Sequence, residues 1–171
     1  MLKVGKGEAN AISKKALKIG TRLHEIIASG NFEANSKDTI EVKNCLKAFL
    51  SWKERYGVQK LQLLERKNNE SIGLTGEADA LWIERDTLID WKSSSRITPE
   101  NFFQLGGYKR LGYDCKELGI VRLDKELGTF EYKTNTDLGL SLEQCVDAFE
   151  AAFKHYRYYT YIQEQLGEYN A

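Results

Sequence analysis

Residues 72–92 read IGLTGEADALWIERDTLIDWK, and this stretch decides the fold. Two short runs rich in apolar and β-branched residues, 72–83 and 87–92, flank a polar turn at 84–86. Such runs on either side of a polar turn are typical of two paired strands. We therefore predict a β-hairpin in the middle of the chain.

Two aspartates and a lysine lie in this hairpin. Side chains alternate between the faces of a strand, so Asp90 and Lys92 should point the same way and Trp91 into the opposite layer. Pairing across the turn can bring Asp79 beside them. Carboxylates are preferred ligands of hard cations such as Mg²⁺, and an ammonium can polarise a water or stabilise phosphate charge. The set predicts a metal site for phosphodiester hydrolysis, although a lone Asp-x-Lys triplet is more often a surface ion pair.

The residues after the hairpin predict a helix over 98–112. Thr98 supplies a capping hydroxyl, and Pro99 suits the first helical position. Gln104 and Tyr108 are four residues apart and therefore share a helix face. This pair could hydrogen-bond the lysine or a phosphate. The alternative is an ordinary amphipathic helix with a half-buried tyrosine.

Another helix is predicted over residues 12–29 from an apolar stripe with helical spacing. His24 lies beside that stripe, one turn beyond Gly20. Its imidazole is either an additional ligand for a Mn²⁺-type ion or a core histidine with satisfied polar atoms, and the residues alone favour neither. We expect the small Gly20 to allow another backbone to approach closely.

The order of these motifs resembles the RecB-type branch of the PD-(D/E)XK nuclease superfamily. The matching motifs span residues 20–108, and they are Gly20-Thr-x-Leu-His24-Glu, Gly76-Glu-Ala-Asp79, Asp90-Trp-Lys92 and Gln104-x-x-x-Tyr108. The resemblance implies an α/β, or mixed α+β, fold with a restriction-endonuclease-like core. In that core a central mixed sheet of about five strands is flanked by helices.

The resemblance also implies roles for single residues. One or two Mg²⁺ or Mn²⁺ ions would be held by His24, Asp79, Asp90 and the main-chain carbonyl of Trp91. Lys92 would be the catalytic lysine, with Gln104 and Tyr108 as the catalytic motif that follows it. Glu65 is the candidate for an additional acid, and it could equally be an exposed charge at the end of a strand.

Three cysteines argue against an iron-sulfur cluster, which some RecB-type relatives bind through four. None of Cys45, Cys115 and Cys145 precedes His24 or belongs to a Cys-x-x-Cys pair, so we expect no cluster. Each is interpreted as a small core hydrophobe. An odd, widely spaced set without a signal peptide favours a reducing, cytoplasmic location without disulfides.

Composition predicts one globular domain over residues 1–171, since 42% of the residues are hydrophobic and 29% are charged. No apolar run is long enough to cross a membrane. The formal net charge of zero is mild evidence against a protein that coats nucleic acid, but it does not exclude a nuclease. The expected elements are helices over 12–29, 38–56, 98–112 and 141–165 and strands over 59–66, 72–83, 87–92, 118–124 and 129–134.

Several residues are candidates for binding substrate. Lys14, Lys18 and Arg22 recur along one helix as a basic ridge, and Ser93 and Arg96 follow the second strand of the hairpin. Solvated lysines on an ordinary helix face are the commoner explanation of such a ridge.

The segment 154–161, KHYRYYTY, has a composition suited to stacking on unpaired bases. The favoured interpretation is nevertheless that Tyr156 and Tyr159 continue the buried stripe of the last helix.

The function expected from these features is that of a metal-dependent deoxyribonuclease. The resemblance favours an exonuclease or end-processing enzyme of recombination, repair or viral DNA metabolism, acting on single-stranded DNA or duplex ends. A structure-selective endonuclease for junctions or flaps, and a catalytically silent relative that binds nucleic acid or protein, are the alternatives. A homo-oligomer and a recombination or replication partner are both left open.

Overall fold

The computed structural model describes residues 6–167, and their side chains from residue 14 onward. The helices and strands follow one another as α1 (Lys6–Ala28), α2 (Ile40–Tyr56), β1 (Leu61–Leu63), β2 (Lys67–Asn69), β3 (Leu74–Gly76), β4 (Ala80–Trp82), β5 (Thr87–Lys92), α3 (Pro99–Arg110), β6 (Glu117–Leu123), β7 (Phe130–Thr134) and α4 (Leu142–Gln165). A single 3₁₀ turn, Ile83–Arg85, joins β4 to β5, and a second, Thr136–Leu138, precedes α4.

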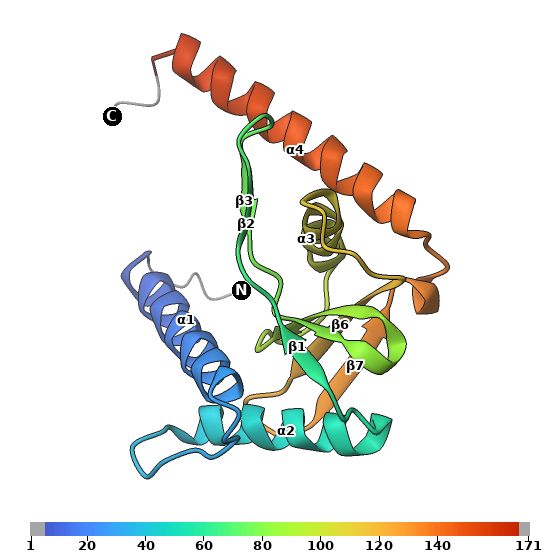
Figure 1. The fold of residues 1–171 in the computed structure, drawn as a ribbon. Coiled ribbons are helices and arrows are strands. Elements are labelled where there is room, and N and C mark those ends of the chain that lie inside the picture. The colour runs from blue at the N-terminus through green and yellow to red at the C-terminus, as the bar shows by residue number, and fades with distance from the viewer. Residues whose placement is uncertain (1–5, 168–171) are drawn as a thin grey trace.

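A five-stranded sheet in the order β1-β4-β5-β6-β7 forms the centre of the molecule (Figure 1). β5 and β6 are parallel, and the other neighbouring pairs are antiparallel. A parallel pair needs a crossover connection, which α3 supplies here. The predicted fold class is confirmed, because the structure is a mixed α/β fold with a mixed five-stranded sheet flanked by helices.

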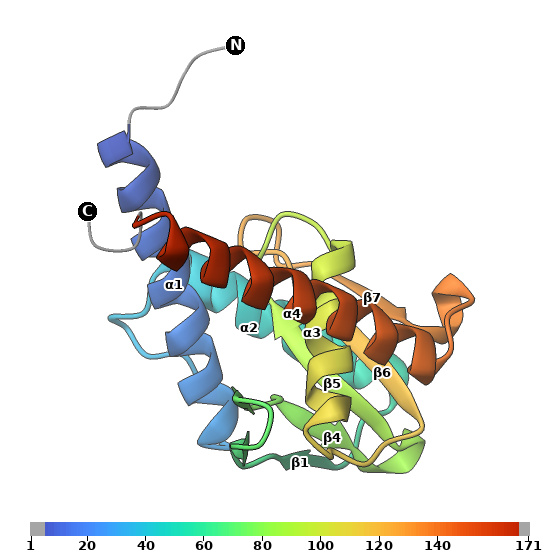
Figure 2. The same cartoon turned by 90° about the horizontal axis from the view of Figure 1, so that it is seen from above.

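Two layers of helices cover the sheet (Figures 1 and 2). Ile89 and Trp91 of β5 belong to the core cluster shared with α1 and α2. Leu88 belongs to the second cluster, shared with Leu105 of α3 and Cys145 of α4. This alternation confirms that Trp91 points away from the face that carries Asp90 and Lys92. Every residue of β5 except Lys92 is buried, as expected of a central strand.

The predicted strands 59–66 and 72–83 are each too long. β2 and β3 pair only with each other, and this two-stranded ribbon leaves the main sheet. The hydroxyl of Tyr113 lies within hydrogen-bond distance of the carbonyls of both Glu65 and Gly76, where the two chain segments leave the sheet. The sequence pattern could not reveal this break, because a tyrosine distant in sequence fixes it.

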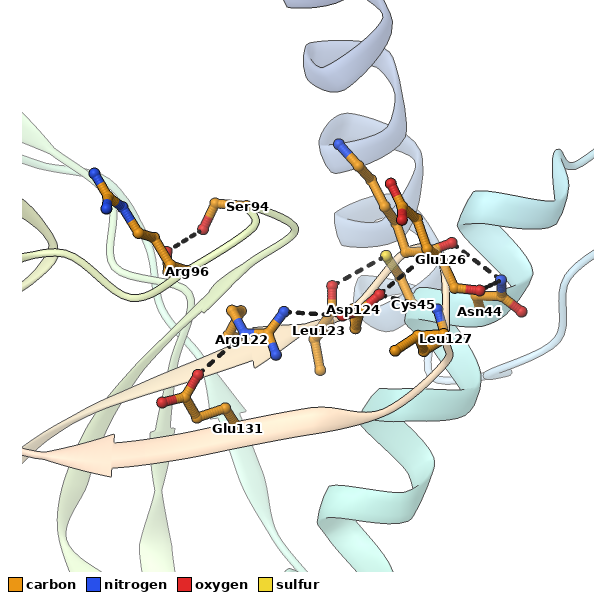
Figure 3. Close-up of polar contacts among 11 residues, drawn as sticks. Asn44, Cys45, Ser94, Arg96, Arg122, Leu123, Asp124, Glu126, Leu127 and Glu131 are labelled. Atoms are coloured by element: carbon orange, nitrogen blue, oxygen red, sulfur yellow. Dashed lines mark hydrogen bonds and ion pairs between the residues drawn. The ribbon is translucent and has the colours of Figure 1, made fainter.

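One close contact in each helical layer joins two elements of the fold. An ideal Cβ on Gly106 of α3 would lie 2.1 Å from the carbonyl oxygen of Cys145, so the backbones of α3 and α4 nearly touch. On the other layer, Asn44 of α2 donates to the carbonyls of Lys125 (3.0 Å) and Glu126 (2.8 Å) in the turn between β6 and β7 (Figure 3). The first contact fixes α4 to α3, and the second fixes α2 to the sheet.

The last helix is longer than the surface it covers. Its first half packs on α3, whereas its second half carries exposed aromatic side chains, among them Tyr156 (60% exposed) and Tyr159 (54%). The expectation that these two tyrosines continue the buried stripe is therefore wrong. The three cysteines are buried in the core, as predicted. None of the helices described is long and apolar enough to cross a membrane.

Candidate active site

The turn between β4 and β5 brings the two predicted aspartates together. Ala80 pairs with Ile89, so the next step of the antiparallel ladder places Asp79 opposite Asp90. Asp79 lies just before β4 and outside the backbone ladder. Its Oδ2 accepts a hydrogen bond of 2.8 Å from the backbone N–H of Trp91, which ties this carboxylate directly to β5.

Asp90 is an acid buried in the sheet and only 3% exposed. Burial, and then the negative charge of Asp79, raise its pKa to about 7, against the opposing charge of Lys92. The ammonium of Lys92 lies 2.7 Å from Oδ2. Among the described residues, this oxygen nevertheless receives no hydrogen bond of acceptable geometry. A buried carboxylate oxygen that accepts no well-formed hydrogen bond is suited to be a ligand of a metal cation.

A chain of hydrogen bonds connects the lysine to α3. Lys92 donates to Oε1 of Gln104 at 2.8 Å, and Nε2 of Gln104 donates to the hydroxyl of Tyr108 at 2.6 Å. Burial, followed by the charges of Asp90 and Asp79, raises the pKa of Tyr108 well above its usual range. Tyr108 therefore remains a neutral phenol beside the acids. The structure thus joins the helical pair to the lysine.

His24 enters the site from α1. Its Nδ1 lies 3.1 Å from Oδ1 of Asp79, and its ring centroid lies 5.8 Å from that of Trp91. Partial burial disfavours the charged imidazole, but the hydrogen bond and charge of Asp79 outweigh this effect, and the net result is a raised pKa. The structure therefore places His24 in contact with Asp79 and not as an isolated core residue.

The donor set suits a hard divalent ion, although its members are paired with one another. Among the side chains described, those of residues 14–167, no three from His, Cys, Asp or Glu are already grouped as ion ligands. His24 contacts Asp79, and Lys92 contacts Asp90, so these contacts must rearrange before an ion is held. Two carboxylates match the ligand preferences of Mg²⁺ and Mn²⁺, and the imidazole is an additional ligand suited to a Mn²⁺-type ion.

An open hollow of about 600 Å³ lies next to these groups. It is bounded by α1 and by the end of β5, and its walls include His24, Trp91, Lys92 and Ser93. The expectation of a close backbone approach at Gly20 is wrong, because the nearest atom to an ideal Cβ there is the hydroxyl of Ser93 at 3.9 Å. The small residue instead widens the hollow.

The proposed basic ridge is only partly free. Arg22 donates to Asp38 at 2.7 Å and to Glu25 at 3.1 Å, so its charge is neutralised within the protein. The sequence pattern did not anticipate Asp38 as this partner. Lys14 and Lys18 are exposed on α1.

Two further predicted residues lie outside these contacts. Arg96 is exposed in the loop after β5, where Ser94 donates to its carbonyl at 2.9 Å and its side chain extends away from Arg122 (Figure 3). Glu65 is exposed between β1 and β2. Among the described polar contacts, none joins its carboxylate to Asp79, Asp90 or Lys92.

Comparison with known proteins gives a distant likeness. No protein-family model and no curated protein matches the chain. Among solved structures, the chain is similar to a phage-related exonuclease from Haemophilus somnus 129PT, with 18% identity, 82% of each chain covered and a TM-score of 0.35. Because the identity and the TM-score are both low, the assignment of a function depends on the chemistry of the site.

The buried acid predicts a pH dependence of stability. The ordinary aspartate pKa is 3.8, and folding raises that of Asp90 to about 7, so folding favours the protonated acid. The contribution of the protonated acid to the free energy of unfolding is complete below pH 4 and is lost as the pH rises through 7. In metal-free protein at pH 8, Asp90→Asn should therefore raise the free energy of unfolding by about 1 kcal/mol or more.

Thermal melts in a metal chelator, from pH 5 to pH 8, measure this effect, with Asp147→Asn as an exposed control. The difference between Asp90→Asn and the wild type should grow with pH. A constant difference would contradict the raised pKa.

Proposed function

We propose that the protein is a metal-dependent nuclease that hydrolyses the phosphodiester bonds of DNA. One observation carries the proposal: Asp90 is a buried carboxylate whose Oδ2 has an ammonium beside it but accepts no well-formed hydrogen bond from the described residues. Burying a charged group without full compensation costs stability. A bound ligand that stabilises the buried carboxylate would explain why the site is built this way, and a divalent cation has the required charge.

The residues that would hold the ion are Asp79, Asp90, His24 and the main-chain carbonyl of Trp91. When bound, such an ion neutralises phosphate charge and lowers the pKa of a water molecule. Asp79 is already positioned by the N–H of Trp91, so little of its conformational freedom is lost on binding. Release of His24 from Asp79 would free one further ligand atom.

Lys92 would orient the attacking water and stabilise the charge that develops on the phosphate. Its ammonium donates to Oε1 of Gln104 and forms an ion pair with Oδ2 of Asp90, and these two contacts fix its position. Gln104 is a positioning residue, since it acts on the water only through Lys92. The hydroxyl of Tyr108 accepts a hydrogen bond from the amide of Gln104 and would remain a neutral phenol throughout.

The exonuclease form of the activity is the one we favour, supported by the RecB-type order of the motifs. A panel of end-labelled single strands, blunt duplexes, flaps, four-way junctions and circular DNA, incubated with Mn²⁺, tests it. We expect shortening from the ends of linear DNA and intact circles. Cleavage of circles or junctions would instead establish the structure-selective endonuclease.

A catalytically silent binding protein would behave differently. Calorimetric titration with Mn²⁺ should give saturable binding to the wild type and none to an Asp79→Ala/Asp90→Ala double variant. An absence of Mn²⁺ binding to the wild type, together with intact DNA in every lane of the panel, would overturn the nuclease proposal.

A further inference from the structure

The second half of α4 carries an aromatic and basic surface outside the active site. Its members recur at helical spacing and line one hollow of about 750 Å³. We call them the tyrosine face, and they are Phe153, Lys154, Arg157, Tyr158 and Tyr161. Tyr158 and Tyr161 are 60% and 58% exposed, so their rings are open to solvent.

The charge of this surface is positive in a protein whose formal net charge is zero. Residues 151–163 include two cations and no acidic residue. Glu150, at the edge of the hollow, is already paired with Arg110 at 2.6 Å. Among the described residues, Lys154 and Arg157 have no acidic partner within ion-pair distance. Their charges are thus available to an anionic ligand.

Flat rings beside unpaired cations match the two parts of a single nucleic-acid strand. Unpaired bases stack on exposed aromatic rings, and lysine and arginine neutralise the phosphates between them. Exposed tyrosines and arginine are also common in protein interfaces, but lysine is depleted there, and two cations without an acidic partner call for a negatively charged occupant. The observed composition therefore favours a nucleic acid as the occupant.

The hollow and the active site are bordered by the same elements of the fold. Arg110, on its wall, lies two residues after Tyr108 on α3. Ile72, also on its wall, is at the tip of the β2–β3 ribbon, and Gly76 at the base of that ribbon is packed against the ring of Tyr108. The same two elements thus border both the hollow and the catalytic residues.

We propose that the tyrosine face binds single-stranded DNA, with bases stacked on Tyr158 and Tyr161 and phosphates at Lys154 and Arg157. This inference rests on the proposed function and adds a substrate class to it: DNA with an unpaired stretch beside the cleaved bond. The face would hold the strand while α3 and the ribbon guide it to Asp90 and Lys92.

Binding can be measured without cleavage, by fluorescence anisotropy of a labelled oligothymidylate in a metal chelator. A Tyr158→Ala/Tyr161→Ala variant should weaken binding by at least about tenfold, because each stacked base contributes roughly this factor. Tyr158→Phe/Tyr161→Phe keeps the rings and should bind as the wild type does. Tyr156→Ala/Tyr159→Ala removes two equally exposed tyrosines from another side of α4 and is the matched control.

Further probes separate stacking from charge and from self-association. Loss of binding in the Tyr158/Tyr161 alanine variant should be much smaller with an abasic strand of the same length, and Lys154→Ala/Arg157→Ala should flatten the salt dependence. Equal loss in the matched control, or equal binding of abasic strand and oligothymidylate by the wild type, would overturn the proposal. So would a wild-type dimer in sedimentation that the Tyr158→Ala/Tyr161→Ala variant abolishes.

The two proposals can fail separately. If the tyrosine variant loses strand binding while the wild type never cuts DNA with Mn²⁺, only the nuclease proposal fails. If the wild type cuts DNA and the tyrosine variant binds and cuts single strands equally well, only the tyrosine face proposal fails.

Discussion

Lys92→Ala should reduce DNA cleavage by about a thousandfold or more, the loss expected when a preorganised charge that stabilises the transition state is removed. The ammonium lies 2.7 Å from Oδ2 of Asp90 and 2.8 Å from Oε1 of Gln104, so its position is fixed before a substrate binds. Single-turnover cleavage of labelled DNA with Mn²⁺ measures the effect.

Two controls make the result specific to the site. Lys116→Ala removes a lysine at the other end of the β5–β6 pair, where its side chain is 84% exposed and contacts Asp86, and it should cut at the full rate. Calorimetry should show that Lys92→Ala still binds Mn²⁺, because the lysine is not a ligand. Cleavage by Lys92→Ala at the wild-type rate would show that this residue has no catalytic part.

Gly106→Ala should lower the free energy of unfolding by about 3 kcal/mol, at the upper end of the range for overpacked cores. The added Cβ would lie 2.1 Å from the carbonyl oxygen of Cys145, a backbone atom that cannot rotate away. Relief requires α3 and α4 to move apart. Urea unfolding of the purified variant measures the change.

Gly20→Ala is the matched control, since it makes the same substitution within a helix that has room for it. The nearest atom to its ideal Cβ is 3.9 Å away, and alanine favours a helix over glycine by about 1 kcal/mol. This variant should be as stable as the wild type or more so. Unfolding of Gly106→Ala at the wild-type urea concentration would mean that the two helices separate at little cost.

The parts of the fold that depend on local pattern could be predicted from the sequence. β5 was predicted with its observed bounds, because an apolar run bounded by a polar turn identifies a central strand. The grouping of Asp79, Asp90 and Lys92 followed from hairpin pairing and the two-residue alternation of a strand. The Gln104–Tyr108 pair followed from helical spacing.

Features that depend on distant contacts could not be predicted in this way. The β2–β3 ribbon leaves the sheet where Tyr113 holds two carbonyls, which no local pattern encodes. The pairing of Arg22 with Asp38 depends on how the loop after α1 folds back. Tyr156 and Tyr159 match the spacing of a buried stripe, but α4 extends past the elements that would cover them.

The separation of the β2–β3 ribbon from the central sheet has an evolutionary consequence. Because its strands pair only with each other, changes in the length or charge of its tip would leave the hydrogen bonds of the five-stranded sheet intact. Insertions at exposed loop tips are generally well tolerated. Selection could therefore change this projection while the acids and the lysine of the central sheet are retained.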